Sequence, residues 1–209
     1  MLENETSVTL AQAVRALHSV AVDGKKTQSP GRLDLLARYC VEQLARRGLH
    51  GACTEVTIPG GARPKKWDVA WQLHGKPRLA ISLKSILQNL AGTVPNRIDD
   101  LMGEVANVQM FSPEIVVGYL IVFDVSLDAH RGKHGTTWCE LLDKRLARLT
   151  GRSGPAWGFG MIEGVALVRV DFSAGALLIS SEEEVEALFD RLVSEVAVRN
   201  PSMQDGYRT

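Results

Sequence analysis

The sequence lacks the cysteine content, the charge bias and the long apolar runs that would place it at once in a specialised class. Its three cysteines, Cys40, Cys53 and Cys139, are odd in number and widely spaced, so they form neither a disulfide framework nor a metal knuckle. We expect buried free thiols instead. The formal net charge is +0, which gives no global argument for nucleic acid and leaves only a local basic surface.

Features of membrane and secreted proteins are also missing. No apolar run approaches the length of a membrane span, and the first residues, MLENETSVTL, are acidic and polar, unlike a signal peptide. We therefore expect a cytoplasmic protein with no membrane partner. With 209 residues, 45% hydrophobic and 23% charged, the chain is long enough for one domain, 1–209, with a sizeable core.

The stretch from Trp67 to Ser85 is the most informative in the chain. Two runs that resemble strands, 67–73 and 78–85, lie on either side of His74-Gly75-Lys76-Pro77, which predicts a hairpin. Asp68 lies at the outer end of the first strand and Lys84 at the outer end of the second. In an antiparallel pair these ends are neighbours, and a divalent metal held by the carboxylate, with the ammonium beside it, would explain the juxtaposition.

Asp68, thirteen intervening residues and then Ser82-Leu83-Lys84 resemble the signature of the PD-(D/E)xK nuclease superfamily, which includes many restriction endonucleases. The resemblance covers about residues 30–125. It implies an α/β fold with a restriction-endonuclease-like mixed central sheet flanked by helices, in the core order αβββαβ. An N-terminal helix, a C-terminal hairpin and a C-terminal helix would be appendages.

The elements expected from periodicity agree with that order. Helices are predicted over 8–22, 31–47, 97–110, 136–149 and 182–198; strands over 52–58, 67–73, 78–85 and 115–123; and a second hairpin over 165–172 and 176–179. The run 115–123, IVVGYLIVF, is apolar throughout and predicts a central strand buried on both faces. Asn96 is a plausible N-cap for the helix at 97–110, because Gly92 and Pro95 suggest a loop or broken helix before it.

The sequence departs from the superfamily pattern where a second acid is expected, because Ser82 stands there. A hydroxyl is a poor ligand for a hard cation. Some nucleases of this superfamily carry Ser-x-Lys and supply the acid from the following helix, and here that helix offers Asp99, Asp100 and Glu104. Only Glu104 borders the apolar face, so we interpret Glu104 as the relocated acid, which would hold the metal together with Asp68.

Several polar residues are candidates for contacts with DNA. Arg63, Lys65 and Lys66 lie on the loop that leads into Asp68, where they either contact phosphates or form a solvated turn. Gln88 and Asn89 either read base edges or satisfy local backbone groups, and their residue types favour the local role.

A second basic loop, 129–135, carries two histidines and two basic residues. Arg131 and Lys133 fit a DNA contact better than a metal site, because the histidines lack suitable spacing and a third ligand.

The resemblance implies a Mg²⁺-dependent deoxyribonuclease, most like a type II restriction enzyme, with Mn²⁺ as a second possible metal. Its catalytic residues would be Asp68, Lys84, Glu104 and Ser82, and its partner double-stranded DNA. A homodimer would suit a palindromic site, and a cognate methyltransferase is a possible second partner. Two alternatives stay open: a nuclease-fold protein that has lost catalysis and keeps a binding role, and an unrelated α/β protein in which Asp68 and Lys84 form a structural ion pair.

Overall fold

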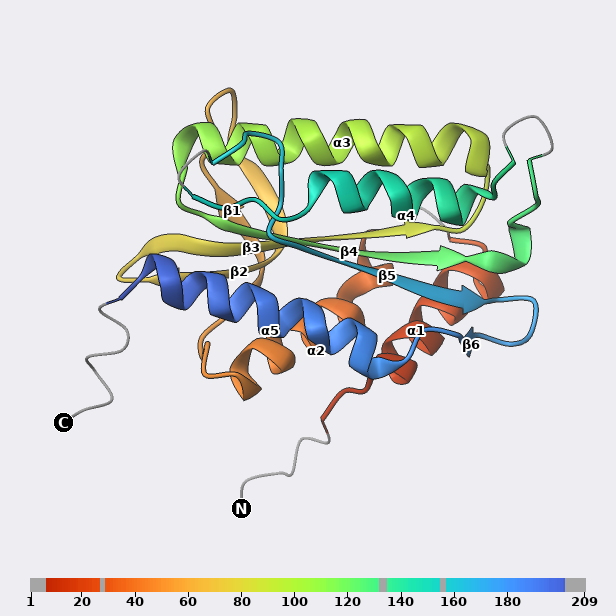
Figure 1. Ribbon diagram of the computed structural model, residues 1–209. Helices are drawn as coiled ribbons and strands as arrows, with labels where there is room; N and C mark the ends of the chain where they lie inside the picture. Colours follow the sequence, from red (N-terminus) through yellow and green to blue (C-terminus); the bar gives the residue numbers. More distant parts are fainter. Residues whose placement is uncertain (1–6, 27–28, 132–134, 155–156, 202–209) are drawn as a thin grey trace, which may run out of the picture.

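The fold consists of one six-stranded mixed sheet between two layers of helices, as seen in a computed structural model (Figure 1). The structure describes residues 7–26, 29–131, 135–154 and 157–201. In chain order the elements are α1 (Leu10–His18), a π-helical turn (Ser19–Asp23), a 3₁₀ turn (Pro30–Leu33), α2 (Asp34–Arg46), β1 (Cys53–Ile58), β2 (Lys65–Leu73), β3 (Lys76–Ile86), α3 (Leu90–Phe111), β4 (Val116–Asp124), a second 3₁₀ turn (Val125–Leu127), α4 (Trp138–Leu149), β5 (Gly164–Asp171), β6 (Leu177–Leu178) and α5 (Glu182–Arg199).

The strands lie in the order β1-β2-β3-β4-β5-β6. Pairs β1–β2, β2–β3 and β5–β6 are antiparallel, whereas β4 is parallel to both β3 and β5. Every residue of β4 is buried, which confirms the predicted central strand. The predicted α/β class, with a mixed sheet flanked by helices, is therefore observed.

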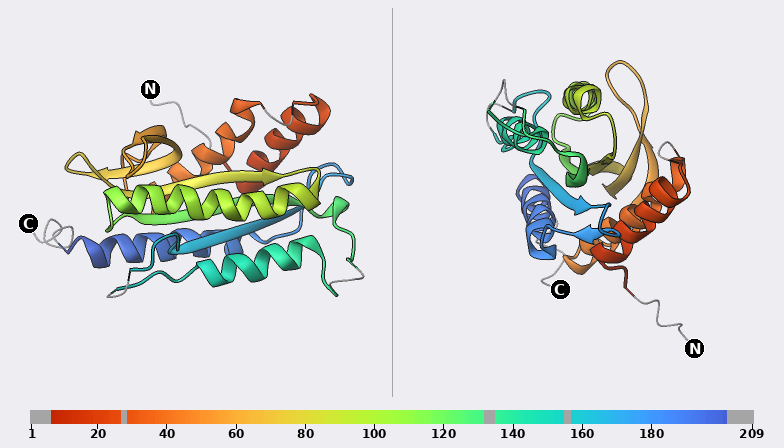
Figure 2. Two further views of the ribbon diagram at one scale, coloured as in Figure 1. Left: turned by 90° about the horizontal axis from the view of Figure 1, so that it is seen from above. Right: turned by 90° about the vertical axis from the view of Figure 1, so that its right-hand side faces the viewer.

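Each face of the sheet has its own core. Helices α3 and α4 cover one face, and α1, α2 and α5 cover the other (Figures 1 and 2). Along β3 the odd positions Leu79, Ile81 and Leu83 point into the α1–α2–α5 core, whereas Ala80 and Ile86 point toward α3. This alternation places Ser82 and Lys84 on the α3 side of the sheet.

The hairpin between β2 and β3 is tighter than the four-residue connection suggests. His74 and Gly75 both have left-handed backbones, with φ of 52° and 73°, and Leu73 pairs with Lys76. Positive φ at both central residues is the conformation that a two-residue turn needs to match the twist of the strands.

The predicted start of α3 is wrong. The helix begins at Leu90, so Asn96 is not its N-cap and Pro95 lies inside it. Pro95 removes one backbone N–H near the helix start. The helix still forms because its buried face continues toward the N-terminus, from Ile98 through Val94 to Leu90. Burial of this stripe outweighs one lost hydrogen bond.

Two smaller predictions also need correction. Helical spacing predicts Met102 on the apolar face with Ile98 and Val105, yet Met102 is 45% exposed. A helix that began at 97 would have Asp99 and Asp100 in its first turn; in the structure they lie farther along α3, and Asp100 pairs with Arg97 at 2.5 Å.

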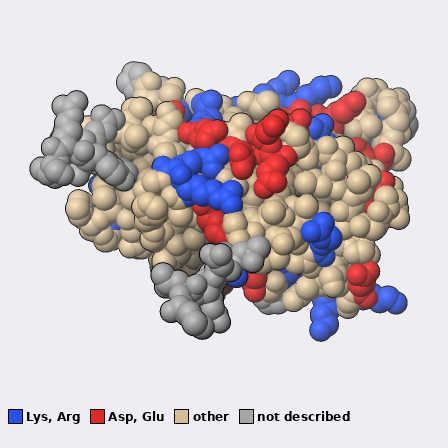
Figure 3. All heavy atoms as spheres, turned by 90° about the horizontal axis from the view of Figure 1, so that it is seen from below, with Lys and Arg blue, Asp and Glu red and all other residues tan. Residues whose placement is uncertain are grey.

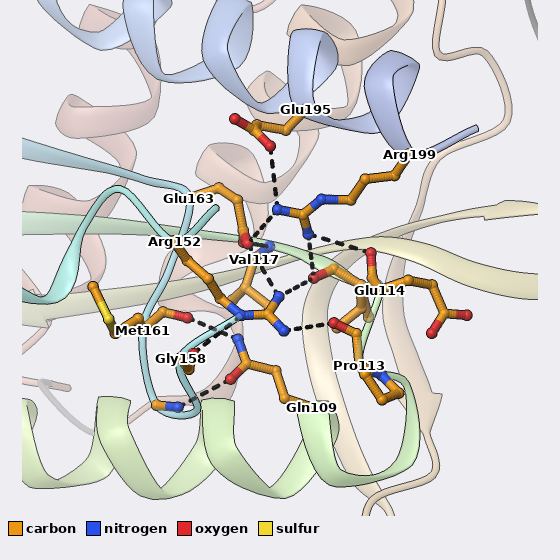
Figure 4. A network of polar contacts seen from close by, with 12 residues as sticks. Gln109, Pro113, Glu114, Val117, Arg152, Gly158, Met161, Glu163, Glu195 and Arg199 are labelled. Carbon is orange, nitrogen blue, oxygen red and sulfur yellow. Dashed lines mark hydrogen bonds and ion pairs between the residues drawn. The ribbon is translucent and has the colours of Figure 1, made fainter. Parts of the chain in front are cut away.

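A closed network of charges lies inside the fold at the start of β4 (Figure 4). Glu163 is fully buried and contacts the guanidinium groups of Arg152 at 3.2 Å and Arg199 at 2.7 Å. Its other oxygen accepts the backbone N–H of Val117 at 2.6 Å. Trp157 lies against both guanidinium groups, 5.2 Å from that of Arg152 and 4.3 Å from that of Arg199.

Backbone oxygens complete this network. Arg152 donates to the carbonyls of Pro113, Ile115 and Gly158 at 2.5 to 3.2 Å. The network thus ties Arg152, Gly158 and the end of α5 to the segment before β4. Neither residue spacing nor periodicity joins Arg152 to Arg199, so the sequence does not predict this network.

Candidate active site

Asp68 lies where β2 and β3 separate. The paired part of the two strands runs from Val69 opposite Ile81 to Leu73 opposite Lys76, so Asp68 precedes it. One carboxylate oxygen of Asp68 accepts the backbone N–H of Leu83 at 2.7 Å. This bond anchors the carboxylate beside the end of β3, next to Lys84.

Ser82, Lys84 and Glu104 meet on the α3 side of the sheet. The Ser82 hydroxyl donates to one oxygen of Glu104 at 3.3 Å, and the Lys84 ammonium lies 3.5 Å from the other. Both charged side chains are partly shielded, with 18% of Lys84 and 21% of Glu104 exposed. The sequence placed Glu104 at the border of the apolar face, and its side chain does point to the strands.

Lys65 is a fourth member of this cluster, in a different position from the one expected. The loop prediction gave it a phosphate contact, but its ammonium forms an ion pair with Glu104 and lies 4.9 Å from the centre of the Trp67 ring. Burial lowers the pKa of Lys65, although the carboxylate of Glu104 opposes that shift. Lys65 is therefore an inner cation of the site rather than a solvated one.

The two carboxylates respond to this environment in opposite ways. Burial raises the pKa of Asp68, and the charge of Glu104 adds to the rise against the effects of the Leu83 N–H, Lys84 and Lys65. Burial also acts to raise the pKa of Glu104, but Lys84 and Lys65 together hold it below its ordinary value. Glu104 is thus the firmly ionised member, and Asp68 is the one that lacks an equivalent cation.

The cluster opens into a cleft of about 460 Å³. Asp68 and Lys84 line this cleft together with Glu55 from β1 and two arginines, Arg32 and Arg97, that sequence reasoning did not select. Arg32 lies on the 3₁₀ turn before α2, and Arg97 lies on α3. The 3₁₀ turn and α3 bring these two arginines together near the end of β3. Because the two segments are far apart in the sequence, no local pattern predicts this arrangement.

The other predicted contacts are distributed around this cleft. Lys66 is exposed and donates to Glu55 at 2.7 Å. Arg63 is exposed on a loop that Asn107 of α3 holds in place. The amide oxygen of Asn107 accepts the backbone N–H groups of Ala62 at 2.9 Å and Arg63 at 3.2 Å, and its amide nitrogen donates to the carbonyl of Arg63 at 2.9 Å. The loop is therefore fixed against α3, with its basic side chains beside the site.

The remaining candidates lie farther along the chain. Gln88 and Asn89 line a smaller cavity next to the cleft. The guanidinium of Arg131 lies 3.8 Å from the centre of the Trp138 ring, while Lys133 lies outside the described residues. Glu42 of α2 lies opposite the predicted apolar stripe of that helix and is occupied elsewhere, since it accepts the backbone N–H of Val8 at 2.7 Å.

The face covered by α1, α2 and α5 carries charges of both signs among the described residues. Figure 3 shows Lys and Arg side chains interspersed with Asp and Glu on that face. Arg47 lies 2.5 Å from Asp190 and 3.7 Å from Glu186 there, across the contact between α2 and α5. These charges satisfy one another, so the arginine-lined cleft is the better candidate for an anionic ligand.

The carboxylates suit one kind of metal ion. Among the described residues, no group of three or more His, Cys, Asp or Glu side chains is placed to hold a metal, which argues against a site built of protein ligands alone. Mg²⁺ instead keeps several waters and uses one or two carboxylates plus phosphate oxygens of the substrate. Asp68 and Glu104 could supply these two carboxylates. Glu104 would then have to exchange part of its contact with Lys65 and Lys84 for the metal ion.

Comparisons with known proteins add no relative: no family model, curated protein or solved structure matches the chain. Within the described residues, no helix has the length and apolar character needed to cross a membrane.

Proposed function

We propose that the chain is a metal-dependent endonuclease that hydrolyses phosphodiester bonds in duplex DNA. The observation that carries this proposal is that Asp68 of β2 and Lys84 of β3 line one cleft, while Glu104 of α3 lies against the Lys84 ammonium. The element order α2-β1-β2-β3-α3-β4 also agrees with the superfamily that the Asp68 and Ser82-Leu83-Lys84 pattern resembles.

Each residue has a distinct role in this proposal. Asp68 and Glu104 hold Mg²⁺, or Mn²⁺ in its place, which when bound supplies Lewis-acid polarisation of the phosphate and a more acidic water. Lys84 orients the attacking water or stabilises the charge that develops on the phosphate. Ser82 keeps the Glu104 carboxylate in place through its hydroxyl and is not itself a ligand.

The inner position of Lys65 favours a second candidate function. Because Lys65 and Lys84 already neutralise Glu104 and Ser82 replaces an acid, the same fold would also suit a DNA-binding protein without catalysis. The third interpretation, a structural pair of Asp68 with Lys84, has less support. Among the described ion pairs, the ammonium of Lys84 lies against Glu104.

A cleavage assay separates these functions. Supercoiled plasmid and linear duplex DNA are incubated with the protein in Mg²⁺, Mn²⁺ or EDTA, together with Asp68→Asn, Lys84→Ala and the control Lys76→Ala, which changes an exposed residue at the far end of the hairpin. Metal-dependent cleavage by the wild type and the control, lost in the two site variants, supports the nuclease. Metal-independent DNA binding without cleavage by any protein supports the second function.

We also propose a homodimer, because a compact domain that cuts both strands of a palindrome presents two active centres. Helix α4 and the C-terminal elements are the surface left for it, and Lys144, Arg145 and Arg148 of α4 are exposed. Light scattering with and without duplex DNA tests this, and a monomer under both conditions counts against cleavage of palindromic sites.

A further inference from the structure

A second, smaller cavity of about 180 Å³ adjoins the cleft at the end of β3. Its polar lining consists of Arg32, Ser85, Gln88, Asn89, Thr93 and Arg97. Among the described residues that line it there is no Asp or Glu, in contrast to the main cleft, whose lining includes Asp34, Glu55 and Asp68. The small cavity is thus a local positive site in a chain with no net charge.

The two arginines are held at this position by different means. The guanidinium of Arg32 donates to the carbonyl of Ser29 at 2.8 Å and to the hydroxyl of Ser85 at 3.3 Å. Arg97 pairs at 2.5 Å with Asp100 through one terminal nitrogen, while its Nε is buried and has no hydrogen-bond partner among the described residues. Donor groups therefore remain available on both side chains.

Placing two guanidinium groups close together has an electrostatic cost, which the pairing of Arg97 with Asp100 offsets only in part. Burial lowers the pKa of Arg32, and the neighbouring charge of Arg97 lowers it further, with Asp68 acting in the opposite direction. A bound anion would remove this repulsion and supply acceptors for the free N–H groups. Arginine's planar set of donors matches the oxygen atoms of a phosphate group.

The position of the cavity indicates which phosphate it would take. Arg32 and Arg97 also line the main cleft, where Asp68 and Lys84 lie, so the two spaces share a wall. We propose that the Arg32–Arg97 cavity binds the phosphate of the DNA strand next to the one held at Asp68 and Lys84. This inference rests on the proposed function and adds to it a contact that sets the register of the strand in the cleft.

The test measures the affinity of the full chain for a short fluorescent duplex by anisotropy, in EDTA and across a series of NaCl concentrations. The proteins are the wild type, Arg32→Gln, Arg97→Gln, the double variant and Arg191→Gln. Arg191 is a matched control, because it is exposed on α5 and its side chain lies beside Gly164 at the start of β5, away from this cavity.

We expect each single variant to lose roughly ten-fold in affinity, because a hydrogen bond to a charged group is lost. For the double variant, the slope of log affinity against log salt should fall by about one, as expected for one phosphate contact. Arg191→Gln should bind as the wild type does. Arg97→Gln alone suffices if Arg32→Gln fails to fold, since the Arg97 guanidinium pairs with the half-exposed Asp100.

Two outcomes overturn the inference while leaving the proposed function in place. One is wild-type affinity and salt slope in both single variants of a protein that binds and cleaves DNA. The other outcome uses inorganic phosphate as the ligand. Phosphate is expected to raise the melting temperature of the wild type more than that of the double variant. If phosphate does so but DNA affinity is unchanged, the cavity serves free phosphate and the DNA assignment is wrong. A wild type that binds no DNA under any condition removes the proposed function as well.

Discussion

The molecule contains two charged clusters that differ in how completely the protein satisfies them. In the buried network, Glu163 is 0% exposed and Arg199 3%. Protein atoms are the partners of Glu163, Arg152 and Arg199, although the buried Nε of Arg199 has no hydrogen-bond partner among the described residues. In the cleft cluster, Lys84 and Glu104 keep about a fifth of their side-chain surface exposed, and Asp68 has a backbone N–H but no equivalent cation.

This difference separates structure from chemistry. A buried charge whose partners are all internal cannot exchange them for a ligand without unfolding its surroundings. Charges at the wall of an open cleft can exchange partners when a cation or a phosphate arrives. The first cluster therefore fixes the start of β4 against α5, and the second is the place where binding and catalysis are expected.

The largest effect on stability is expected when Glu163, the acid at the centre of the buried network, is removed. Glu163→Ala leaves two guanidinium groups without their shared acid, so we expect a loss of about 3–5 kcal/mol in the free energy of unfolding. Urea denaturation measures it. The control is Asp190→Ala, which removes an exposed partner of Arg47 and should cost less than about 1 kcal/mol. Equal losses in the two variants would show that the buried network is no more important than a surface pair.

The corresponding change in the cleft should affect activity much more than stability. Glu104→Gln keeps the size of the side chain but removes the charge that would hold the metal. We expect DNA cleavage to fall by more than about 100-fold, while the free energy of unfolding falls by roughly 1–3 kcal/mol, because the glutamine carbonyl can still accept hydrogen bonds from Lys65 and Lys84. Cleavage at the wild-type rate would show that Glu104 is not a metal ligand and that another carboxylate acts together with Asp68.

Removing the inner cation should strengthen metal binding. Lys65→Met leaves Glu104 with one ammonium instead of two, so we expect Mn²⁺ to bind roughly five-fold more tightly, equivalent to about 1 kcal/mol. Calorimetric titration compares it with Lys66→Met, whose ammonium pairs with Glu55 on the surface. Weaker binding in Lys65→Met would mean that Lys65 supports the ligands rather than competing with the metal.

The smallest effect is expected at Ser82. Ser82→Ala removes one 3.3 Å hydrogen bond to Glu104 while Lys65 and Lys84 still hold the carboxylate. Cleavage should fall by less than about five-fold, because this long hydrogen bond contributes little while two ammonium groups remain in place. A variant as inactive as Asp68→Asn would show that the hydroxyl does more than position Glu104.

The sequence predicted the features of the fold that depend on local residue patterns. Period-two and period-3.6 spacing located the strands of the central hairpin, the buried strand β4 and the face of α3 that carries Glu104. The start of α3 was missed, because local rules give Pro95 and Gly92 more weight than the burial of Leu90 and Val94 that the tertiary fold provides.

Contacts between distant segments were out of reach. Arg152 and Arg199 are joined only through Glu163, and Arg32 lies near Arg97 only because two helices end beside β3. Lys65 was read as a loop residue that contacts phosphate, since nothing in its neighbours indicates that α3 presents Glu104 to it. Side-chain partners chosen by packing leave no periodic signal in a single sequence.

The binding of Mn²⁺ to the folded, DNA-free protein tests the central claim most directly. We predict saturable binding of one ion per chain in a calorimetric titration, lost in both Asp68→Asn and Glu104→Gln and retained in Lys66→Met. Both site variants must melt cooperatively, near the temperature of the wild type. A folded wild type that shows no saturable binding of Mn²⁺ or Mg²⁺, or binding that survives both substitutions, would contradict the assignment of the cleft as a metal-dependent active site.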